Sequence, residues 1–101
     1  PIYIDELVRL IHIVIERNEM GIFNVVSSER LSKYDFGLKI AKTLSLPTNL
    51  ISPASIHEFD NLTKRPLDMS LSNLKLKNII KGEVKNLDLQ IMMLKEKSKN
   101  L

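Results

Sequence analysis

Histidine and serine are the residue types in this chain that could form a metal site or act as a nucleophile. His12 and His57 lie far apart in the sequence and in different predicted elements, whereas metal ligands usually converge at short spacing. The chain has no cysteine, which excludes disulfides and thiolate metal sites. No G-x-S-x-G motif marks a serine nucleophile. We therefore predict no metal ligand and no catalytic residue in this chain.

Glycine-rich loops that hold phosphates are also missing. Gly21, Gly37 and Gly82 are isolated, and none belongs to a G-x-G-x-x-G pattern that follows a predicted strand. Such loops need glycine because the backbone must approach the phosphate closely. The sequence therefore predicts no cofactor site within this chain.

The Arg-Pro pair in the stretch NLTKRPLDMSLSNLKL is the strongest candidate for a binding residue. Pro66 biases Arg65 toward an extended backbone, which restricts the direction of its side chain. A guanidinium presents a rigid fork of donors that matches carboxylate and phosphate oxygens. By residue type alone, Arg65 is either an ordinary solvated or salt-bridged loop arginine or an anion contact.

The net charge of +3 is unevenly distributed. Residues 1–60 contain six Lys/Arg and eight Asp/Glu, a net −2, whereas residues 61–101 contain nine and four, a net +5. A basic half can attract phosphates or an acidic partner, although a solvated lysine-rich surface has the same composition. All aromatic residues precede position 60, so the basic half lacks the stacking platforms typical of nucleic-acid binding.

Length and composition indicate one folded domain that is part of a longer protein. The chain has 101 residues, of which 44% are hydrophobic and 27% charged, as is usual for globular proteins. No apolar run approaches the length of a membrane span. The absence of cysteine favours a cytoplasmic location. The sequence begins with Pro1 and its first methionine is Met20, so we expect a fragment.

The first element is predicted to be a helix with Asp5 as its N-cap and Gly21 at its C-terminal end. Apolar residues occupy most of its circumference, so other structure should cover it. We therefore expect either self-association or an exposed apolar patch on this helix.

The next segments predict an α/β fold, a mostly helical fragment with a short parallel βαβ unit. Residues 22–26 are β-branched and aromatic, as is typical of a strand. Ser32 and Asp35 have the spacing of a helix-capping box, and residues 50–52 could form a second short strand. Strand, helix and strand in this order predict parallel pairing with a right-handed crossover.

Two further helices are predicted after Pro66. Ser72 has the features of an N-cap for the first, which Gly82 would end. Asn86 begins the last helix, which should run to Leu94, with residues 95–99 frayed.

Three stretches in this order resemble the C-terminal part of extended short-chain dehydrogenases/reductases, and most closely the dTDP-4-dehydrorhamnose reductase branch. They are PIYIDELVRLI, GIFNVVSSERLSKYDFGLKIA and KRPLDMSLSNLKL. The resemblance extends from Pro1 to about Leu94. It implies an NAD(P)-dependent oxidoreductase acting on a nucleotide-linked sugar, with residues 1–101 forming a single substrate-binding lobe.

The resemblance also implies site residues. Arg65 would contact the diphosphate of the nucleotide sugar, with Pro66 setting the loop. Ser27 and Ser28 would lie near the wall of the substrate pocket.

The family's cofactor and catalytic motifs are missing from this chain. The Tyr-x-x-x-Lys pair is absent, because Leu7 follows Tyr3 and Leu38 follows Tyr34 at that spacing. NADPH or NADH would therefore bind an upstream Rossmann domain of the same protein. Two alternatives stay open. One is a non-catalytic relative resembling the methionine adenosyltransferase regulatory subunit, and the other is a basic interaction module formed by residues 72–99.

Overall fold

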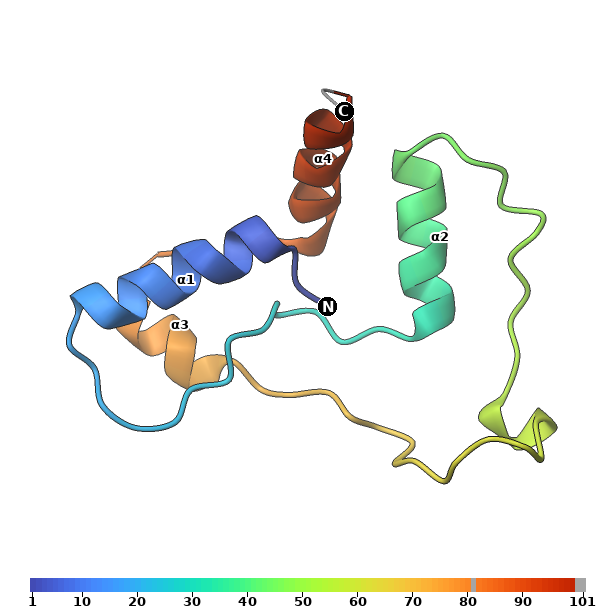
Figure 1. The fold of residues 1–101 in the computed structure, drawn as a ribbon, viewed down its shortest axis with the longest axis horizontal. Helices are drawn as coiled ribbons and strands as arrows, with labels where there is room; N and C mark the ends of the chain where they lie inside the picture. The colour runs from blue at the N-terminus through green and yellow to red at the C-terminus, as the bar shows by residue number, and fades with distance from the viewer. Residues whose placement is uncertain (81, 100–101) are drawn as a thin grey trace. The chain divides into compact units, whose positions relative to one another are not determined.

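The computed structural model describes residues 1–80 and 82–99, and this part of the chain is entirely helical apart from its loops. Figure 1 shows the helices in order along the chain. Their bounds are Ile4–Glu16 for α1, Lys33–Thr43 for α2, Leu74–Ile80 for α3 and Leu87–Ser98 for α4, with a single 3-10 turn, η1, at Ile56–Glu58.

The predicted α/β fold with a βαβ unit is wrong, because the described residues contain no strand. Side chains, rather than a neighbouring strand, bond to the backbone of residues 22–26. Lys75 Nζ donates to the Ile22 carbonyl at 2.9 Å, and Asn73 Nδ2 donates to the Val26 carbonyl at 2.9 Å. The second expected strand is a turn, in which the Ile51 amide donates to the Thr48 carbonyl.

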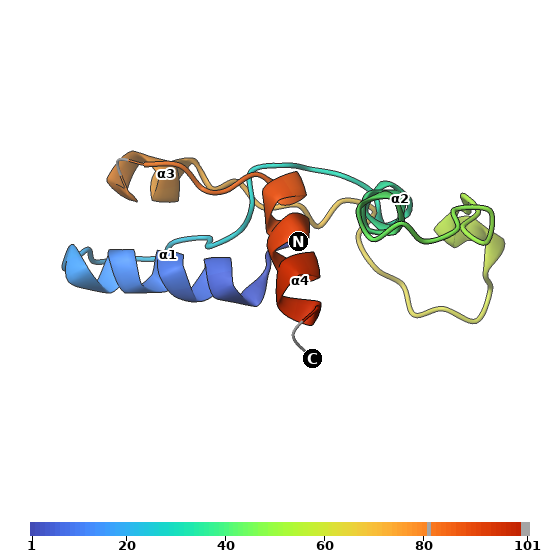
Figure 2. The same cartoon turned by 90° about the horizontal axis from the view of Figure 1, so that it is seen from above.

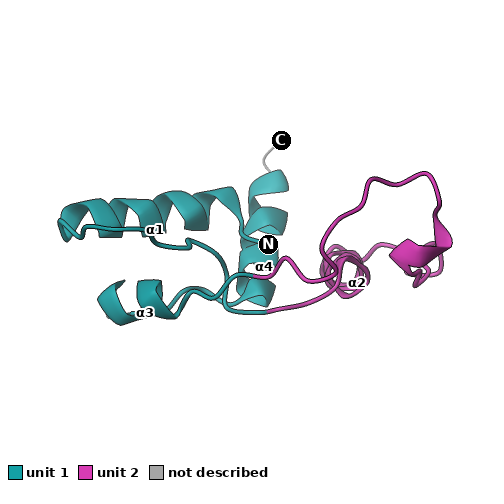
Figure 3. Cartoon of the chain, turned by 90° about the horizontal axis from the view of Figure 1, so that it is seen from below, with its two compact units in different colours: residues 1–29, 71–101 teal, residues 30–70 magenta. Residues whose placement is uncertain are grey.

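The chain divides into two compact units, coloured separately in Figure 3. Unit 1 comprises Pro1–Glu29 and the chain from Leu71 onward, and it contains α1, α3 and α4. Unit 2 is Arg30–Ser70 and contains α2 and η1. The two segments that were expected to pair as strands therefore belong to different units.

The core of unit 1 lies between α1 and α3, which are adjacent in Figures 1 and 2. Leu10, Leu76 and Ile80 are at most 5% exposed and form its centre. Six partly buried hydrophobic residues surround them: Ile2, Ile13, Val14, Val25, Ile79 and Val84. Removing these apolar side chains from water is the main favourable term for this packing.

Helix α4 meets the N-terminal end of α1, as Figure 2 shows. The Tyr3 amide donates to Gln90 Oε1 at 2.8 Å, and Lys97 Nζ lies 3.0 Å from Asp5 Oδ2. Leu87 and Ile91 are buried on α4, as their helical spacing predicts. The predicted helix end at Leu94 is wrong, since α4 continues to Ser98.

The caps of α1 differ from those predicted. Its N-cap is Tyr3, which makes no side-chain capping bond, and Asp5 lies within the first turn, where the positive end of the helix dipole favours an acidic residue. The helix ends at Glu16 rather than near Gly21, and Asn18 takes a left-handed conformation with φ of 52°. Asparagine tolerates this conformation better than most residues, so it ends the helix before the glycine.

The predicted cap of α2 at Ser32 and the predicted start of α4 at Asn86 are confirmed. Ser32 Oγ accepts from the Asp35 amide at 3.0 Å, and Asn86 Oδ1 accepts from the Leu89 amide at 2.8 Å. Helix α3 begins at Leu74, so Ser72 lies one residue before the N-cap position, with its hydroxyl 3.4 Å from the Leu74 amide.

Unit 2 is thinly packed. Ala41 on α2 is its one buried apolar residue among the described residues, and every residue from 52 to 70 is exposed. The Arg-Pro pair lies in this exposed stretch, so its side chains are available to bind a ligand.

Candidate functional site

Arg65 lies in the exposed loop that closes unit 2. Among the described residues, no hydrogen bond or ion pair reaches its guanidinium. Lys64 is also exposed. Two adjacent cations with free donors are therefore present in one loop.

Asp68, three residues further on, fixes the end of this loop. Its Oδ1 accepts from the Ser70 amide at 2.9 Å and from Ser70 Oγ at 2.6 Å. Its Oδ2 accepts from Arg30, with distances of 3.1 Å to Nε and 3.0 Å to Nη2. Arg30 and Ser70 are the first and last residues of unit 2, so one carboxylate joins both ends of the unit.

The hydrogen bonds to Asp68 favour its ionised form. The Ser70 hydroxyl and amide, together with the Arg30 guanidinium, hold the pKa of the Asp68 carboxyl far below its usual range. Hydrogen bonds to the ionised form favour that form, so Asp68 stays negatively charged at any ordinary pH. Since both of its oxygens are already occupied, Asp68 does not neutralise Arg65.

The two candidate serines lie in unit 1, whereas Arg65 and Pro66 lie in unit 2. Ser27 is 6% exposed, and its Oγ accepts from Gln90 Nε2 at 2.8 Å. Ser28 is exposed, and its Oγ accepts from Asn73 Nδ2 at 2.9 Å. Both hydroxyls therefore help to attach residues 27–28 to α4 and to Asn73, the residue before α3, and their role as substrate contacts stays a prediction.

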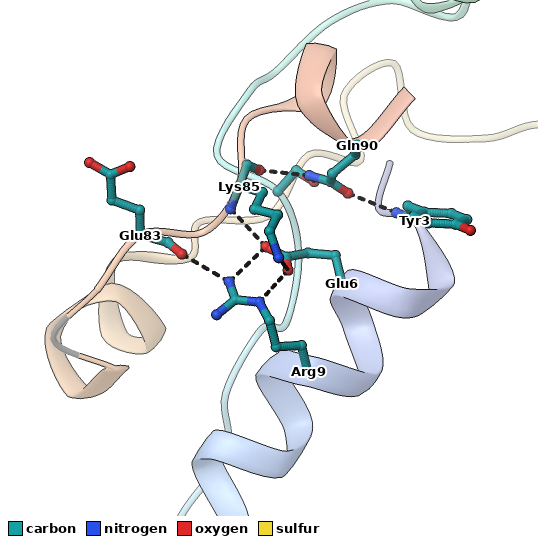
Figure 4. A network of polar contacts seen from close by, with 7 residues as sticks. Tyr3, Glu6, Arg9, Glu83, Lys85 and Gln90 are labelled. Atoms are coloured by element: carbon teal, nitrogen blue, oxygen red, sulfur yellow. Dashed lines mark hydrogen bonds and ion pairs between the residues drawn. The ribbon is translucent and has the colours of Figure 1, made fainter. Parts of the chain in front are cut away.

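A buried polar network in unit 1 is the feature that sequence reasoning missed (Figure 4). Glu6 is fully buried, and its oxygens accept from Arg9 Nε at 2.6 Å, from Arg9 Nη2 at 2.9 Å and from the Lys85 amide at 2.7 Å. Gln90, 1% exposed, bonds the Tyr3 amide through Oε1 and the Lys85 carbonyl through Nε2. These contacts join the start of α1 to the segment before α4.

The charged groups of this network are paired with one another, which indicates a structural role. Burial opposes ionisation of Glu6, but the bonds from Arg9 and from the Lys85 amide outweigh it, and its pKa lies below the ordinary value. Arg9 also donates to the Glu83 carbonyl at 2.9 Å. The oxygens of Glu6 are already bonded, so the network holds the fold rather than reacting with a ligand.

The spacing of residues in the sequence did indicate that Glu6 faces the core. It lies four residues before Leu10 and seven before Ile13, so it shares their face of α1. The helix dipole accounts for an acidic residue such as Asp5 in the first turn, but not for the burial of Glu6.

Neither a metal centre nor a membrane span emerges from the described residues. No group of three or more histidine, aspartate or glutamate side chains there could hold a metal ion. None of the helices found there has the length and apolar character needed to cross a bilayer.

Comparison with protein-family models, with curated protein sequences and with solved structures finds no significant match.

Proposed function

We propose that residues 1–101 form the substrate-binding part of an NAD(P)-dependent nucleotide-sugar reductase resembling dTDP-4-dehydrorhamnose reductase. The observation that supports the proposal is the exposure of the Arg65 side chain and its lack of a partner within the described part of the chain. Its guanidinium is exposed and has no partner among the described residues, and the Asp68 carboxylate, three residues further along the chain, is occupied by Ser70 and Arg30. In this proposal Arg65 contacts the diphosphate of the nucleotide sugar.

The physical basis is the fit between a guanidinium and phosphate oxygens. Two parallel N–H donors can bind one phosphate group, and each charge-assisted bond contributes about 1.5–3 kcal/mol. Pro66 limits the conformations of Arg65 before binding, so less entropy is lost when the side chain is ordered. Pro66 supports the loop that holds Arg65, whereas Ser27 and Ser28 belong to unit 1 and their role as substrate contacts is a separate prediction.

The cofactor belongs to another part of the proposed protein. NADPH or NADH would bind a Rossmann domain upstream of residue 1, which would also supply the catalytic tyrosine and lysine. The contribution of this chain is to bind the sugar nucleotide and orient it toward the nicotinamide. A cytoplasmic location is part of the same proposal.

The experiment that tests this function is titration of the chain with dTDP-glucose, followed by amide chemical shifts up to millimolar ligand. Arg65→Ala should raise the dissociation constant about 10- to 100-fold, the effect of one lost charge-assisted contact. Arg65→Lys should recover part of the affinity, because it keeps the charge but loses the fork.

Lys42→Ala is the matched control, because Lys42 is another exposed cation in unit 2. It removes the same charge and should leave the affinity nearly unchanged. Thymidine, which has no phosphate, should bind weakly and equally to all variants. Absence of dTDP-glucose binding by the unaltered chain, or equal effects of Arg65→Ala and Lys42→Ala, would contradict the proposed role.

The basic interaction module receives less support from the contacts in unit 1. Lys75 bonds the Ile22 carbonyl and lies 4.4 Å from the centre of the Phe23 ring. Lys85, Lys97 and Lys99 pair with glutamate or aspartate side chains. Since these lysines are engaged within the chain, a strong and salt-dependent affinity for nucleic acid is not expected.

A further inference from the structure

Helix α1 has two opposite apolar faces, and the fold of unit 1 covers one of them. Leu10 and Ile13 lie on the covered face, which packs toward α3. A row of four β-branched residues on the other face is exposed: Ile4 by 58%, Val8 by 59%, Ile11 by 41% and Ile15 by 67%. We call this row the α1 seam. Its exposure agrees with the apolar patch that the sequence predicts for this helix.

The spacing of the seam is that of helices that pair with one another. Its members follow one another at intervals of four, three and four residues, which places them along one line of an α-helix. Apolar residues repeating in this way form the contact line of coiled coils, where side chains of one helix fit between those of the other. The seam therefore has the pattern of a helix-pairing surface.

We propose that the α1 seam binds the α1 seam of a second copy of this chain, with the two helices antiparallel. A two-fold axis through the middle of the seam sets Ile4 opposite Ile15 of the other copy, and Val8 opposite Ile11. This symmetric arrangement brings the same patch of each copy together, as in most homodimers. The inference does not depend on the nucleotide-sugar assignment, because the seam lies in unit 1 and Arg65 in unit 2.

The residues that flank the seam favour the antiparallel orientation. Leu7 and Val14 line one edge, and Asp5 and His12 line the other, each pair seven residues apart. Antiparallel helices bring like edges together. Leu7 then lies near Val14 of the second copy, and Asp5 lies near His12, whose imidazole can donate to a carboxylate.

The parallel orientation lacks this complementarity. It would bring the edge with Asp5 and His12 against the aliphatic edge of the other copy. In the isolated chain these polar groups already make exposed contacts, Asp5 with Lys97 and His12 with Glu16. Exposed pairs of this kind contribute little, so they can be shared or exchanged when the second copy binds.

A lipid bilayer fits the same face less well. Helices that lie on membranes usually carry lysine and arginine beside their apolar face. The polar side of α1 instead carries Asp5 and Glu16, and Arg9 is bonded to Glu6. The acidic residues beside the seam would be repelled by anionic lipids.

The proposed interface is small, so a weak dimer is expected. The seam covers about three turns of one helix, and stable interfaces generally bury more than about 1,000 Å² in total. We therefore expect a dissociation constant in the micromolar range or above. Sedimentation velocity of the chain from 5 μM to 1 mM, a range of about 200-fold that brackets this affinity, should show a monomer–dimer equilibrium.

Substitutions in the seam test the surface. Ile11→Lys and Val8→Lys each place a charge at the centre of the interface, and each should raise the dissociation constant at least ten-fold. Ile22→Lys is the matched control, because Ile22 is 86% exposed and lies outside the seam. All three variants replace an exposed side chain, so circular dichroism should show an unchanged helix content.

Cysteine cross-linking tests the orientation, and the chain contains no cysteine that would interfere. Val8→Cys and Ile11→Cys chains are mixed and oxidised. The antiparallel pair predicts mainly mixed disulfides between position 8 of one copy and position 11 of the other. A parallel pair predicts disulfides between identical positions instead.

Several results would overturn the proposal. These are a monomer at all concentrations, a dimer that Ile22→Lys weakens as much as Ile11→Lys does, and disulfides mainly between identical positions. A monomer that binds vesicles of anionic phospholipid through the seam would assign the face to membranes instead.

Discussion

Glu6→Gln removes a buried negative charge from unit 1 while keeping the size and shape of the side chain. The carboxylate is fully buried and accepts hydrogen bonds from both Arg9 and the Lys85 amide. Glutamine has a single acceptor oxygen, so at least one of these donors then faces an NH₂ group. The variant therefore tests whether the network in Figure 4 stabilises the fold.

The expected loss of stability in Glu6→Gln follows from the exposure of Arg9 and Lys85. Hydrogen bonds to charged groups contribute about 1.5–3 kcal/mol each, and breaking a buried ion pair costs about 3–5 kcal/mol. The side chains of Arg9 and Lys85 are 36% and 32% exposed, so water can solvate the cations that Glu6 leaves behind. We therefore expect the free energy of unfolding to fall by about 2–3 kcal/mol at pH 7.

The stability lost in Glu6→Gln should become smaller as the pH falls. The pKa of Glu6 is lower in the folded chain than its ordinary value. A carboxyl of this kind stabilises the fold above its unfolded pKa, and the contribution is lost as the pH falls through the folded pKa. The difference between the unaltered chain and Glu6→Gln should therefore be largest at neutral pH and shrink below about pH 4.3.

Urea unfolding followed by circular dichroism at pH 7 and at pH 3 measures both quantities. Glu83→Gln is the matched control, because the Glu83 side chain is exposed and only its carbonyl contacts Arg9. It should change stability by less than about 0.5 kcal/mol. A loss for Glu6→Gln no greater than that of the control, or a loss that is the same at both pH values, would refute the assigned role.

Four further substitutions test individual contacts or backbone strain, each by thermal unfolding. The Tyr3 hydroxyl is buried and makes no hydrogen bond of good geometry among the described residues, although Asp5 and Lys97 lie close enough to influence its pKa. Tyr3→Phe should therefore change the Tm little; a clear decrease would mean that the contact with Asp5 stabilises the fold. Asn73→Ala should cost about 1–3 kcal/mol, because it leaves the Val26 carbonyl unpaired; an effect below 0.5 kcal/mol, about the level of an ordinary surface substitution, would contradict this. Ser45 has φ of 57°, so Ser45→Gly should stabilise the chain by up to about 1 kcal/mol, and by more than Asn18→Gly, because asparagine tolerates this conformation better. Equal or opposite effects at positions 45 and 18 would show that strain at Ser45 is relieved elsewhere.

The candidate site was predictable in part. Pro66 and the polar residues around it predict an exposed, extended loop, and the structure has one. The Asp68 carboxylate, three residues after Arg65, is paired with Arg30, which lies 38 residues earlier in the chain. No local pattern predicts that pairing, since an aspartate three residues after an arginine is an equally plausible partner for it.

Sequence alone determined the features that depend on near neighbours. Residue type and spacing predicted Ser32 as a helix cap and Asn86 as the start of the last helix. In the structure each accepts a hydrogen bond from the amide three residues later. The apolar spacing on α1 likewise predicted more hydrophobic surface than one small unit can cover, and the α1 seam is exposed.

Only the tertiary structure decided what partners each segment finds. Residues 22–26 have the composition of a strand, but a strand requires a second one beside it. In this chain their carbonyls bond instead to Lys75 and Asn73. Glu6 likewise became a buried charge because folding brought Lys85 to the start of α1. Secondary-structure propensity is a property of one segment. Strand pairing and charge burial depend on two segments that are distant in the sequence, and these segments meet only when the chain folds.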